Sequence, residues 1–238
     1  MEANIYAIGV GPGDPELVTR KAERILRQAD VILAPVARLG ETSVALETVR
    51  EFLDADRQKV ILHQFPMTAD TSKLVPAWEE AVNLMAEQVA LGRSVAFITI
   101  GDPLLYSTFI YLLRILRVSH PNIVVEIVPG ISSINTAAAV AGVSLAESEE
   151  RIIIIPATAG MEKVIEALAK YETVVLLKVK PAYAGLLELL RQTGRSENAI
   201  FVERAGTDRQ KILRGVDAMV AHSPDYLSLM IVTTPHAS

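Results

Sequence analysis

The sequence predicts an α/β protein built from two unlike domains, with a mainly parallel sheet in the N-terminal domain and a mixed sheet in the C-terminal one. In the first half, short apolar runs rich in β-branched residues alternate with helical patterns, which is typical of a parallel sheet with crossover helices. In the second half, some runs follow each other too closely for a crossover helix. Glycine-containing turns follow several strand-like runs, where open α/β folds bind ligands. We therefore expect one active-site cleft, located between the two domains.

The expected N-terminal sheet consists of five apolar runs. The run 95–100 is continuously apolar, as in a parallel strand that is buried on both faces. A helical pattern over 76–91 carries one apolar stripe, and Gly92 stands where a C-terminal cap belongs. The five runs are residues 4–8, 31–34, 60–64, 95–100 and 123–128.

The first helix is expected to begin at Asp14. This residue is a good N-cap, and Pro15 and Glu16 suit the first turn of a helix. The buried face of this helix is expected to be a stripe with a period of 3.6 residues. Its members are Val18, Ala22, Ile25, Leu26 and Ala29.

In the second half, a small-residue helix from Ala137 to Gly142 precedes a further set of strand-like runs. The short spacing between the runs 200–204 and 212–215 implies an antiparallel or mixed sheet. We therefore expect an N-terminal domain over 1–128, and a linker helix with the C-terminal domain over 129–238. The expected strands are residues 152–155, 173–179, 198–203, 212–215 and 227–233.

Composition excludes several classes of protein. The chain has 238 residues, of which 50% are hydrophobic and 21% charged, so it is expected to fold around a substantial core. Its net charge of −5 makes it a poor general nucleic-acid binder. It has no cysteine, no signal-peptide pattern before the first strand, and no apolar run long enough to span a membrane. We expect a cytoplasmic protein with neither a nucleic-acid nor a membrane partner.

The sequence predicts no metal site. Thiolate ligands are absent because there is no cysteine, and the four histidines show neither a ligand spacing nor a nucleophile partner. They are His63, His120, His222 and His236.

Three turn segments carry most of the functional information: GVGPGDPELVT at 9–19, TIGDPLLYST at 99–108 and VPGISS at 128–133. The first invites a dinucleotide interpretation, but its third glycine comes one residue too early for the fingerprint. In addition, Pro12 lacks the N–H that a phosphate needs, and Asp14 adds a negative charge. Two Gly-Asp-Pro turns favour a cationic or hydroxyl-rich ligand, with Leu104 and Leu105 as apolar walls. Taken alone, GPGDP is also consistent with a simple strand-to-helix turn.

In this order and at this spacing, the stretches GVGPGDPELVTRKA, GDPLLYST and PGISS resemble the tetrapyrrole methyltransferases that use S-adenosylmethionine, over nearly the whole chain. Within that family, GDPLLYSTF, FPMT at 65–68, Ala77-Trp78 and IIIIPA at 152–157 resemble the branch that methylates precorrin-2 or cobalt-precorrin-2 at the C(20) bridge carbon in cobalamin biosynthesis. The resemblance implies two unlike α/β domains with a deep cleft, a homodimer, S-adenosylmethionine as cofactor and a tetrapyrrole as substrate. It leaves open whether the substrate already holds cobalt.

The resemblance also implies which residues bind the cofactor. Asp102 is expected to accept hydrogen bonds from the ribose hydroxyls or the amino group of the cofactor; alternatively, it caps the next helix. The family often has a methionine near Lys178, so a contact there is expected to come from the backbone. The full set is Pro12, Ile100, Gly101, Asp102, Leu105, Ser132, Ser133, Leu177, Lys178 and Ala205.

A tetrapyrrole substrate carries many carboxylates, which fixed cations can bind. The candidate cations are Arg38, Lys178, Lys180, Arg204 and Arg209, each of which is alternatively a solvated surface charge. Tyr106 is the catalytic candidate, because a phenol can donate a hydrogen bond to the macrocycle while its ring stacks; alternatively, it is a packed core tyrosine.

Other functions stay open at this point. A methyltransferase of the same fold could act on another macrocycle carbon, on ribosomal RNA or on a modified histidine of a translation factor. A non-catalytic tetrapyrrole carrier would need no cofactor pocket. An oxidoreductase would need to bind a nicotinamide cofactor, which the early third glycine argues against.

Overall fold

The structure is a computed structural model that describes residues 4–38, 40–68 and 70–234. The chain forms two compact units, Met1–Ser132 and Ser133–Ser238, and each unit has its own hydrophobic clusters. We refer to them as unit 1 and unit 2 and describe each by itself.

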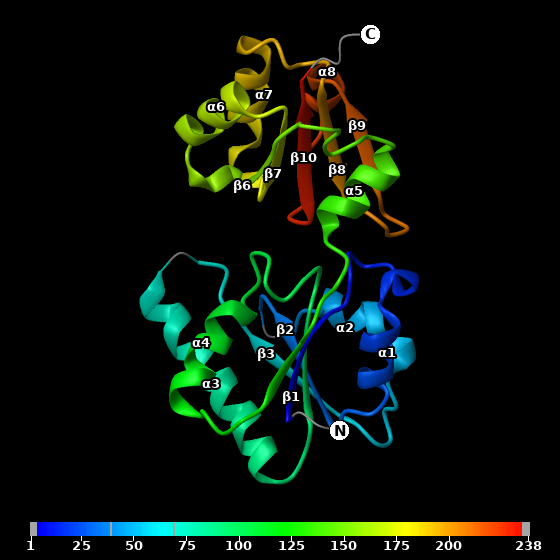
Figure 1. Cartoon of the computed structure of the whole chain (residues 1–238), viewed down its shortest axis with the longest axis vertical. Helices are drawn as coiled ribbons and strands as arrows, with labels where there is room; N and C mark the ends of the chain where they lie inside the picture. Colours follow the sequence, from blue (N-terminus) through cyan, green and yellow to red (C-terminus); the bar gives the residue numbers. More distant parts are fainter. Residues whose placement is uncertain (1–3, 39, 69, 235–238) are drawn as a thin grey trace. The chain divides into compact units, whose positions relative to one another are not determined.

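Unit 1 contains a parallel sheet of five strands in the order β3-β2-β4-β1-β5. All four pairings are parallel, which confirms the sequence-based prediction for this half. Because β1 pairs with β4 on one side and β5 on the other, the carboxyl ends of these three strands lie side by side (Figure 1). The strands are β1 (Ile5–Gly9), β2 (Val31–Val36), β3 (Lys59–Gln64), β4 (Val95–Thr99) and β5 (Val125–Val128).

Helices cover both faces of this sheet. Alternate residues of a strand point to opposite faces, so Tyr6 and Ile8 join the cluster of α1 and α2, while Ile5 and Ala7 join that of α3 and α4. Burial on both faces explains why β1, β2 and β4 have continuous apolar sequences. The helices are α1 (Arg20–Leu26), α2 (Val44–Val49), α3 (Thr71–Ala90) and α4 (Phe109–Ser119), with short 3-10 turns η1 (Pro15–Leu17) and η2 (Arg50–Phe52).

The prediction of one helix starting at Asp14 is wrong. The Asp14 side chain accepts the Glu16 N–H at 2.9 Å and caps only η1, which ends at the extended residue Val18. Thr19 then caps α1, since its hydroxyl oxygen accepts the N–H of Ala22 at 3.2 Å. A second good N-cap, Thr19, five residues after Asp14, therefore divides the expected helix into two elements. The predicted stripe is otherwise buried, apart from the half-buried Val18.

The boundaries of α3 also differ from the expected 76–91. The helix begins at Thr71, because the carboxylate of Asp70 accepts the N–H of Ser72 at 3.0 Å and acts as its cap. At the other end Gly92 adopts φ +74°, as expected for the residue that terminates a helix.

Unit 2 contains a mixed sheet, as predicted, and the order of its strands is β6-β7-β10-β8-β9. β6 and β7 are parallel, whereas β10 is antiparallel to both β7 and β8, and β9 is antiparallel to β8. β7 ends at Leu177 rather than at residue 179, because Lys178 adopts φ +54° and turns the chain out of the strand. The strands are β6 (Ile152–Pro156), β7 (Thr173–Leu177), β8 (Ala199–Glu203), β9 (Lys211–Arg214) and β10 (Ser228–Thr233).

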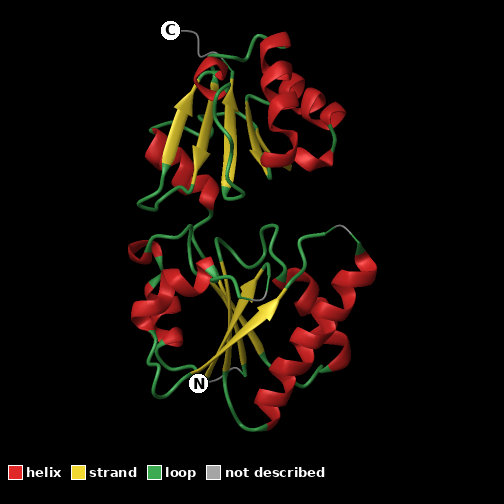
Figure 2. Ribbon diagram, turned by 180° about the vertical axis from the view of Figure 1, so that it is seen from behind, coloured by secondary structure: helices red, strands yellow, loops and turns green. Residues whose placement is uncertain are grey.

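The helices of unit 2 also lie on both faces of their sheet (Figure 2). α5 (Ser133–Ala141) packs through Ile134 and Ala138 against one face, and the larger cluster with α6, α7 and α8 covers the other. α6 is Met161–Lys170, α7 is Tyr183–Gln192 and α8 is Val216–Met219, with 3-10 turns η3 (Ala157–Ala159) and η4 (Lys180–Ala182). In the described part of the chain, no helix is long and apolar enough to cross a membrane.

Candidate active site

The three turns singled out in the sequence meet at the carboxyl edge of the sheet of unit 1. The N–H of Gly101, in the turn after β4, donates to the carbonyl oxygen of Gly11, in the turn after β1, at 2.7 Å. The N–H of Gly130, in the turn after β5, donates to Oδ2 of Asp102 at 3.2 Å. The order of the strands thus brings together segments that are about ninety residues apart in the sequence.

The backbones of these turns touch, which explains two of the glycines. A Cβ on Gly9 would lie 2.4 Å from the carbonyl oxygen of Gly101, and a Cβ on Gly130 would lie 2.1 Å from that same oxygen. Neither position accepts a side chain without movement of the backbone, so both glycines serve close packing of the turns.

Gly101 has a different role. It is buried and adopts φ +68°, yet a Cβ built on it would meet no atom within 4 Å apart from its two chain neighbours. Ile100 beside it is half-buried, and Leu105 is 37% exposed. Pro12 is buried and has no N–H to offer a phosphate. The turns therefore combine space beside the Gly101 backbone with apolar side chains, which suits an uncharged ring better than a phosphate.

The carboxylate of Asp102 holds two of the turns together. Its Oδ1 accepts the N–H of Leu104 at 2.8 Å, and its Oδ2 accepts the N–H of Gly130. The alternative that Asp102 caps the next helix is wrong, because α4 begins only at Phe109. A carboxylate has about four acceptor sites, so Asp102 retains the capacity to accept hydrogen bonds from a ligand.

Tyr106 is 46% exposed, so the alternative of a packed core tyrosine is wrong. Its backbone adopts φ +53°, a left-handed conformation that costs a residue with a Cβ about 1–2 kcal/mol. The next residue anchors the turn: Oγ of Ser107 accepts the N–H of Phe109 at 3.2 Å and lies 3.3 Å from Oγ1 of Thr99. Strain of this kind is common where a side chain has to be presented to a ligand.

Three more of the predicted residues, Ser132, Ser133 and Arg38, lie near these turns. Ser132 is half-buried in the turn after β5, and Ser133 is the first residue of α5. Arg38 is exposed just beyond the end of β2, and β2 neighbours β4 in the sheet. Its cation is therefore at the same edge of the sheet as the turns, one strand further out.

Unit 2 carries the remaining predicted residues at one edge of its own sheet. β7 and β8 both flank β10 in antiparallel orientation, and Leu177 and Val202 pair with the same residue of β10, Leu229. The residues that follow β7 and β8 therefore lie at the same edge. There Lys178 is exposed, and both it and Arg204 adopt a left-handed backbone, with φ +54° and +48°. Lys180 and Arg209 are exposed, whereas Ala205 is buried.

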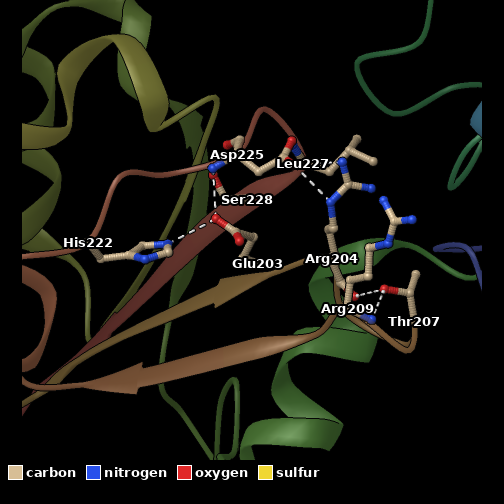
Figure 3. A network of polar contacts seen from close by, with 8 residues as sticks. All are labelled: Glu203, Arg204, Thr207, Arg209, His222, Asp225, Leu227 and Ser228. Carbon is tan, nitrogen blue, oxygen red and sulfur yellow. Dashed lines mark hydrogen bonds and ion pairs between the residues drawn. The ribbon is translucent and has the colours of Figure 1, made fainter.

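The sequence did not reveal the polar network around Arg204 (Figure 3). Asp225 Oδ2 accepts a hydrogen bond from Arg204 Nε at 2.8 Å and forms an ion pair with Nη2 at 2.6 Å. His222 and the N–H of Asp225 in turn contact Glu203. Burial acts to raise the pKa of Asp225, but hydrogen bonds from Arg204 and from the N–H of Leu227 outweigh it, so the pKa is lowered. Asp225 is far from Arg204 in the sequence and carries no motif, so no local signal could have identified it.

No group of three or more potential metal ligands occurs among residues 4–38, 40–68 and 70–234. His63 is buried and its Nε2 lies 2.8 Å from the carbonyl oxygen of Ala77, while His222 contacts Glu203. His236 lies outside the described residues.

Turns that converge at the strand ends of an open α/β sheet are typical of the ligand-binding site of an enzyme. Residues 4–218 match the family of tetrapyrrole (corrin/porphyrin) methylases, and the chain belongs to this family. The chain is 35% identical over 233 residues to cobalt-precorrin-2 C(20)-methyltransferase of Salmonella typhimurium, an alignment that covers 98% of this chain and 97% of the relative. It is also 30% identical over 236 residues to precorrin-2 C(20)-methyltransferase of Sinorhizobium, with 96% and 94% covered. The resemblance to the C(20) branch is thus confirmed.

Solved structures share the fold. Cobalt precorrin-4 methyltransferase aligns with a TM-score of 0.72 at 24% identity, over 96% of this chain and 94% of its own. Uroporphyrin-III C-methyl transferase from Thermus thermophilus, complexed with S-adenyl homocysteine, aligns with a TM-score of 0.70 at 23% identity, over 97% of each chain. These similarities confirm the predicted fold class.

Proposed function

We propose that the protein transfers a methyl group from S-adenosylmethionine to the C(20) bridge carbon of precorrin-2 or cobalt-precorrin-2, a step of cobalamin biosynthesis. The convergence of the three turns at the carboxyl edge of β4, β1 and β5 is the observation that carries this proposal. The names of relatives that cover nearly the whole chain at 30–35% identity support the choice of substrate.

The turns of unit 1 fit the cofactor. The space beside Gly101 allows close approach, Ile100 and Leu105 supply apolar contacts, and Asp102 supplies an acceptor for hydroxyl or amino hydrogens. A carboxylate is also favourable beside the cationic sulfonium and α-amino groups. We therefore assign cofactor binding in unit 1 to Pro12, Ile100, Gly101, Asp102, Leu105, Ser132 and Ser133, and in unit 2 to Leu177, Lys178 and Ala205.

When bound, the cofactor supplies an electrophilic methyl group on a sulfonium centre. The bridge carbon of a partly reduced tetrapyrrole is already nucleophilic, so the chain's residues act mainly by orientation and by exclusion of water. Asp102 fixes the turns that hold the cofactor, and Tyr106 orients the macrocycle by donating its phenolic proton as a hydrogen bond. No strong base is required, and none is assigned among the proposed site residues.

The substrate is held through its carboxylates. Arg38, Lys180, Arg204 and Arg209 are the proposed cations, all at strand ends of the two sheets. Guanidinium groups bind carboxylates in a bidentate manner, so the arginines are expected to contribute more than the lysine. The cleft between the domains stays a prediction.

We also propose that the protein is a cytoplasmic homodimer with no nucleic-acid partner. Its net charge of −5 supports the last point, and the family resemblance supports the dimer. Size-exclusion chromatography with light scattering tests the dimer directly: a mass near 26 kDa, that of one 25.8 kDa chain, overturns it.

Calorimetric titration with S-adenosylhomocysteine, followed by incubation of S-adenosylmethionine with precorrin-2 with and without cobalt, tests the activity. We expect saturable binding and a mass gain of one methyl group, with NMR assigning the new methyl group to C(20). Methylation at another carbon would overturn the position but not the chemistry. Absence of S-adenosylhomocysteine binding would overturn the methyltransferase assignment and favour a carrier.

A further inference from the structure

A chain of polar contacts at the end of β8 leads to Arg204 and begins at a buried carboxylate (Figure 3). Glu203, the last residue of β8, is only 5% exposed. Its Oε2 accepts hydrogen bonds from Nε2 of His222 at 3.0 Å and from the N–H of Asp225 at 2.7 Å. A buried carboxylate needs such partners, so Glu203 fixes the backbone of the segment before β10 at Asp225.

Both oxygens of the Asp225 carboxylate are then committed. Oδ1 accepts the N–H of Leu227 at 3.2 Å, while Oδ2 accepts the Nε hydrogen of Arg204 at 2.8 Å and forms an ion pair with Nη2 at 2.6 Å. The backbone of Arg204 is held as well, because its N–H donates to the carbonyl oxygen of Leu227 at 2.8 Å. Backbone and side chain of Arg204 are therefore fixed by the same short segment.

Asp225 contacts only one edge of the Arg204 guanidinium, so another edge can bind a ligand. A guanidinium has five N–H donors; the Nε hydrogen is donated to Asp225, and Nη2 forms an ion pair with the same oxygen. Within the described residues Nη1 contacts no hydrogen-bond acceptor, and the Arg204 side chain is 26% exposed. The edge formed by Nη1 and Nη2 has the geometry that binds a carboxylate with two parallel hydrogen bonds.

Arg209 adds a second cation to the same place. The hydroxyl of Thr207 donates to the carbonyl oxygen of Arg204 at 2.8 Å and accepts the N–H of Arg209 at 3.2 Å, so one side chain organises both backbones. Figure 3 shows the side chain of Arg209 extending to the same side as that of Arg204. Neither arginine forms an ion pair with the neighbouring Asp208 in the described part of the chain. Because both guanidinium groups are positively charged and extend to the same side of the loop, they favour the binding of an anion.

We propose that Asp225, anchored by Glu203, is a positioning residue that holds the Arg204 guanidinium ready to receive a carboxylate of the tetrapyrrole substrate. The inference rests on the proposed function. Asp225 does not touch the substrate itself; it removes the rotational freedom that Arg204 would otherwise lose on binding, and such preorganisation increases affinity. Specificity for a carboxylate follows from the bidentate edge that remains.

The test compares Asp225→Asn, Arg204→Lys and the double variant with the wild-type protein. An asparagine side chain cannot accept at both positions, because one of its two ends is a donor. Lysine keeps the positive charge but lacks the parallel N–H donors of a guanidinium. The stable octacarboxylate uroporphyrin III serves as probe, with its Kd read from the absorbance titration. Calorimetry with S-adenosylhomocysteine and the thermal midpoint are measured in parallel, and KM for precorrin-2 is measured where turnover occurs.

We expect Asp225→Asn and Arg204→Lys each to weaken uroporphyrin binding about tenfold, equivalent to about 1.4 kcal/mol. The double variant is expected to be no weaker than Arg204→Lys alone, because both changes break the same interaction. KM for precorrin-2 should rise by the same factor with kcat unchanged. The Kd for S-adenosylhomocysteine should not change. Asp217→Asn is the matched control, since it breaks the exposed Arg191–Asp217 ion pair of the same unit, and it should bind uroporphyrin like wild type.

Three results would overturn the inference: uroporphyrin binding by Asp225→Asn equal to that of wild type, additive effects in the double variant, or a parallel loss of S-adenosylhomocysteine affinity and thermal stability. A wild-type protein that does not bind uroporphyrin overturns it too. A different result would contradict the proposed function: a wild-type protein that binds uroporphyrin but transfers no methyl group. In that case the Kd values of the variants relative to wild type still test the role of Asp225.

Discussion

Gly130→Ala tests the convergence of the three turns most directly. The added Cβ would lie 2.1 Å from the carbonyl oxygen of Gly101, and real Cβ atoms essentially never approach closer than 3.0 Å. The turn after β4 must therefore withdraw by about 0.9 Å relative to the turn after β5. The backbone of Gly130 does not have a positive φ, so the effect comes from this overlap rather than from the conformation of the new alanine.

The displacement affects two hydrogen bonds as well as packing. Overpacking costs about 1–3 kcal/mol, and a buried hydrogen bond to a charged group contributes about 1.5–3 kcal/mol. The bond at risk is that from the Gly130 N–H to Asp102 at 3.2 Å; the bond from the Gly101 N–H to Gly11, at 2.7 Å, is weakened as well. We expect the free energy of unfolding of unit 1 to fall by about 3 kcal/mol. A misplacement near 1 Å can cost about 100-fold in a site, so S-adenosylhomocysteine binding should weaken by about that factor.

Urea unfolding and calorimetric titration measure the two effects. Gly185→Ala is the matched control: this glycine lies within α7, and its Cβ would meet only the flexible end of Met161 at 3.0 Å. There alanine is expected to stabilise the protein by up to about 1 kcal/mol through helix propensity, with no effect on binding. A Gly130→Ala variant with wild-type stability and wild-type affinity would refute the argument that the turns are in backbone contact.

The remaining predictions concern single side chains. Asp102→Asn should weaken S-adenosylhomocysteine binding less than Asp102→Ala does, because asparagine can satisfy one of the two N–H groups and alanine neither; equal affinities in calorimetry would count against the role of Asp102. Tyr106→Gly should leave the free energy of unfolding within about 1 kcal/mol of wild type, since it relieves left-handed strain, but should lower kcat/KM for precorrin-2 at least about tenfold; an unchanged rate excludes Tyr106 from the reaction. Hydrogen bonds from the N–H and then from the hydroxyl of Ser94 lower the pKa of Asp30 in the folded protein. The pair therefore stabilises the fold at pH values above the unfolded pKa of Asp30, near 3.8. This stabilisation is lost as the pH falls through the lowered pKa of the folded state. Ser94→Ala should therefore raise the pKa of Asp30 in an NMR titration and destabilise the protein by about 1 kcal/mol at pH 7 but less at pH 2; an equal loss at both pH values would contradict this assignment.

Much of this protein could be predicted from its sequence because the signals are local. A strand buried on both faces has to be apolar throughout, so the run 95–100 predicts β4 within one residue of its observed bounds. The short spacing between β8 and β9 excludes a crossover and so predicts their antiparallel pairing. The ordered Gly-Asp-Pro and Pro-Gly turns identify the family, because each needs particular residue types at particular backbone positions.

Where caps compete, the sequence was ambiguous. Asp14 and Thr19 are both good N-caps, and only the packed structure decides that the first closes a short 3-10 turn while the second starts α1. The same holds for β7, whose apolar run continues past Leu177 although the chain leaves the sheet at Lys178. Apolar patterns report burial, and burial alone does not set where a backbone turns.

The tertiary structure alone decided which residues meet. The order β3-β2-β4-β1-β5 brings the turns after β1, β4 and β5 together. As a result, Asp102 accepts a hydrogen bond from the N–H of Gly130, and the backbone of Gly9 packs against that of Gly101. The pairing of β10 with β8 likewise places Asp225 beside Arg204, although neither residue's sequence neighbourhood points to the other. Local residue types determined the elements and the chemistry available, while long-range strand pairing, which depends on the packing of the whole core, determined the geometry of the candidate site.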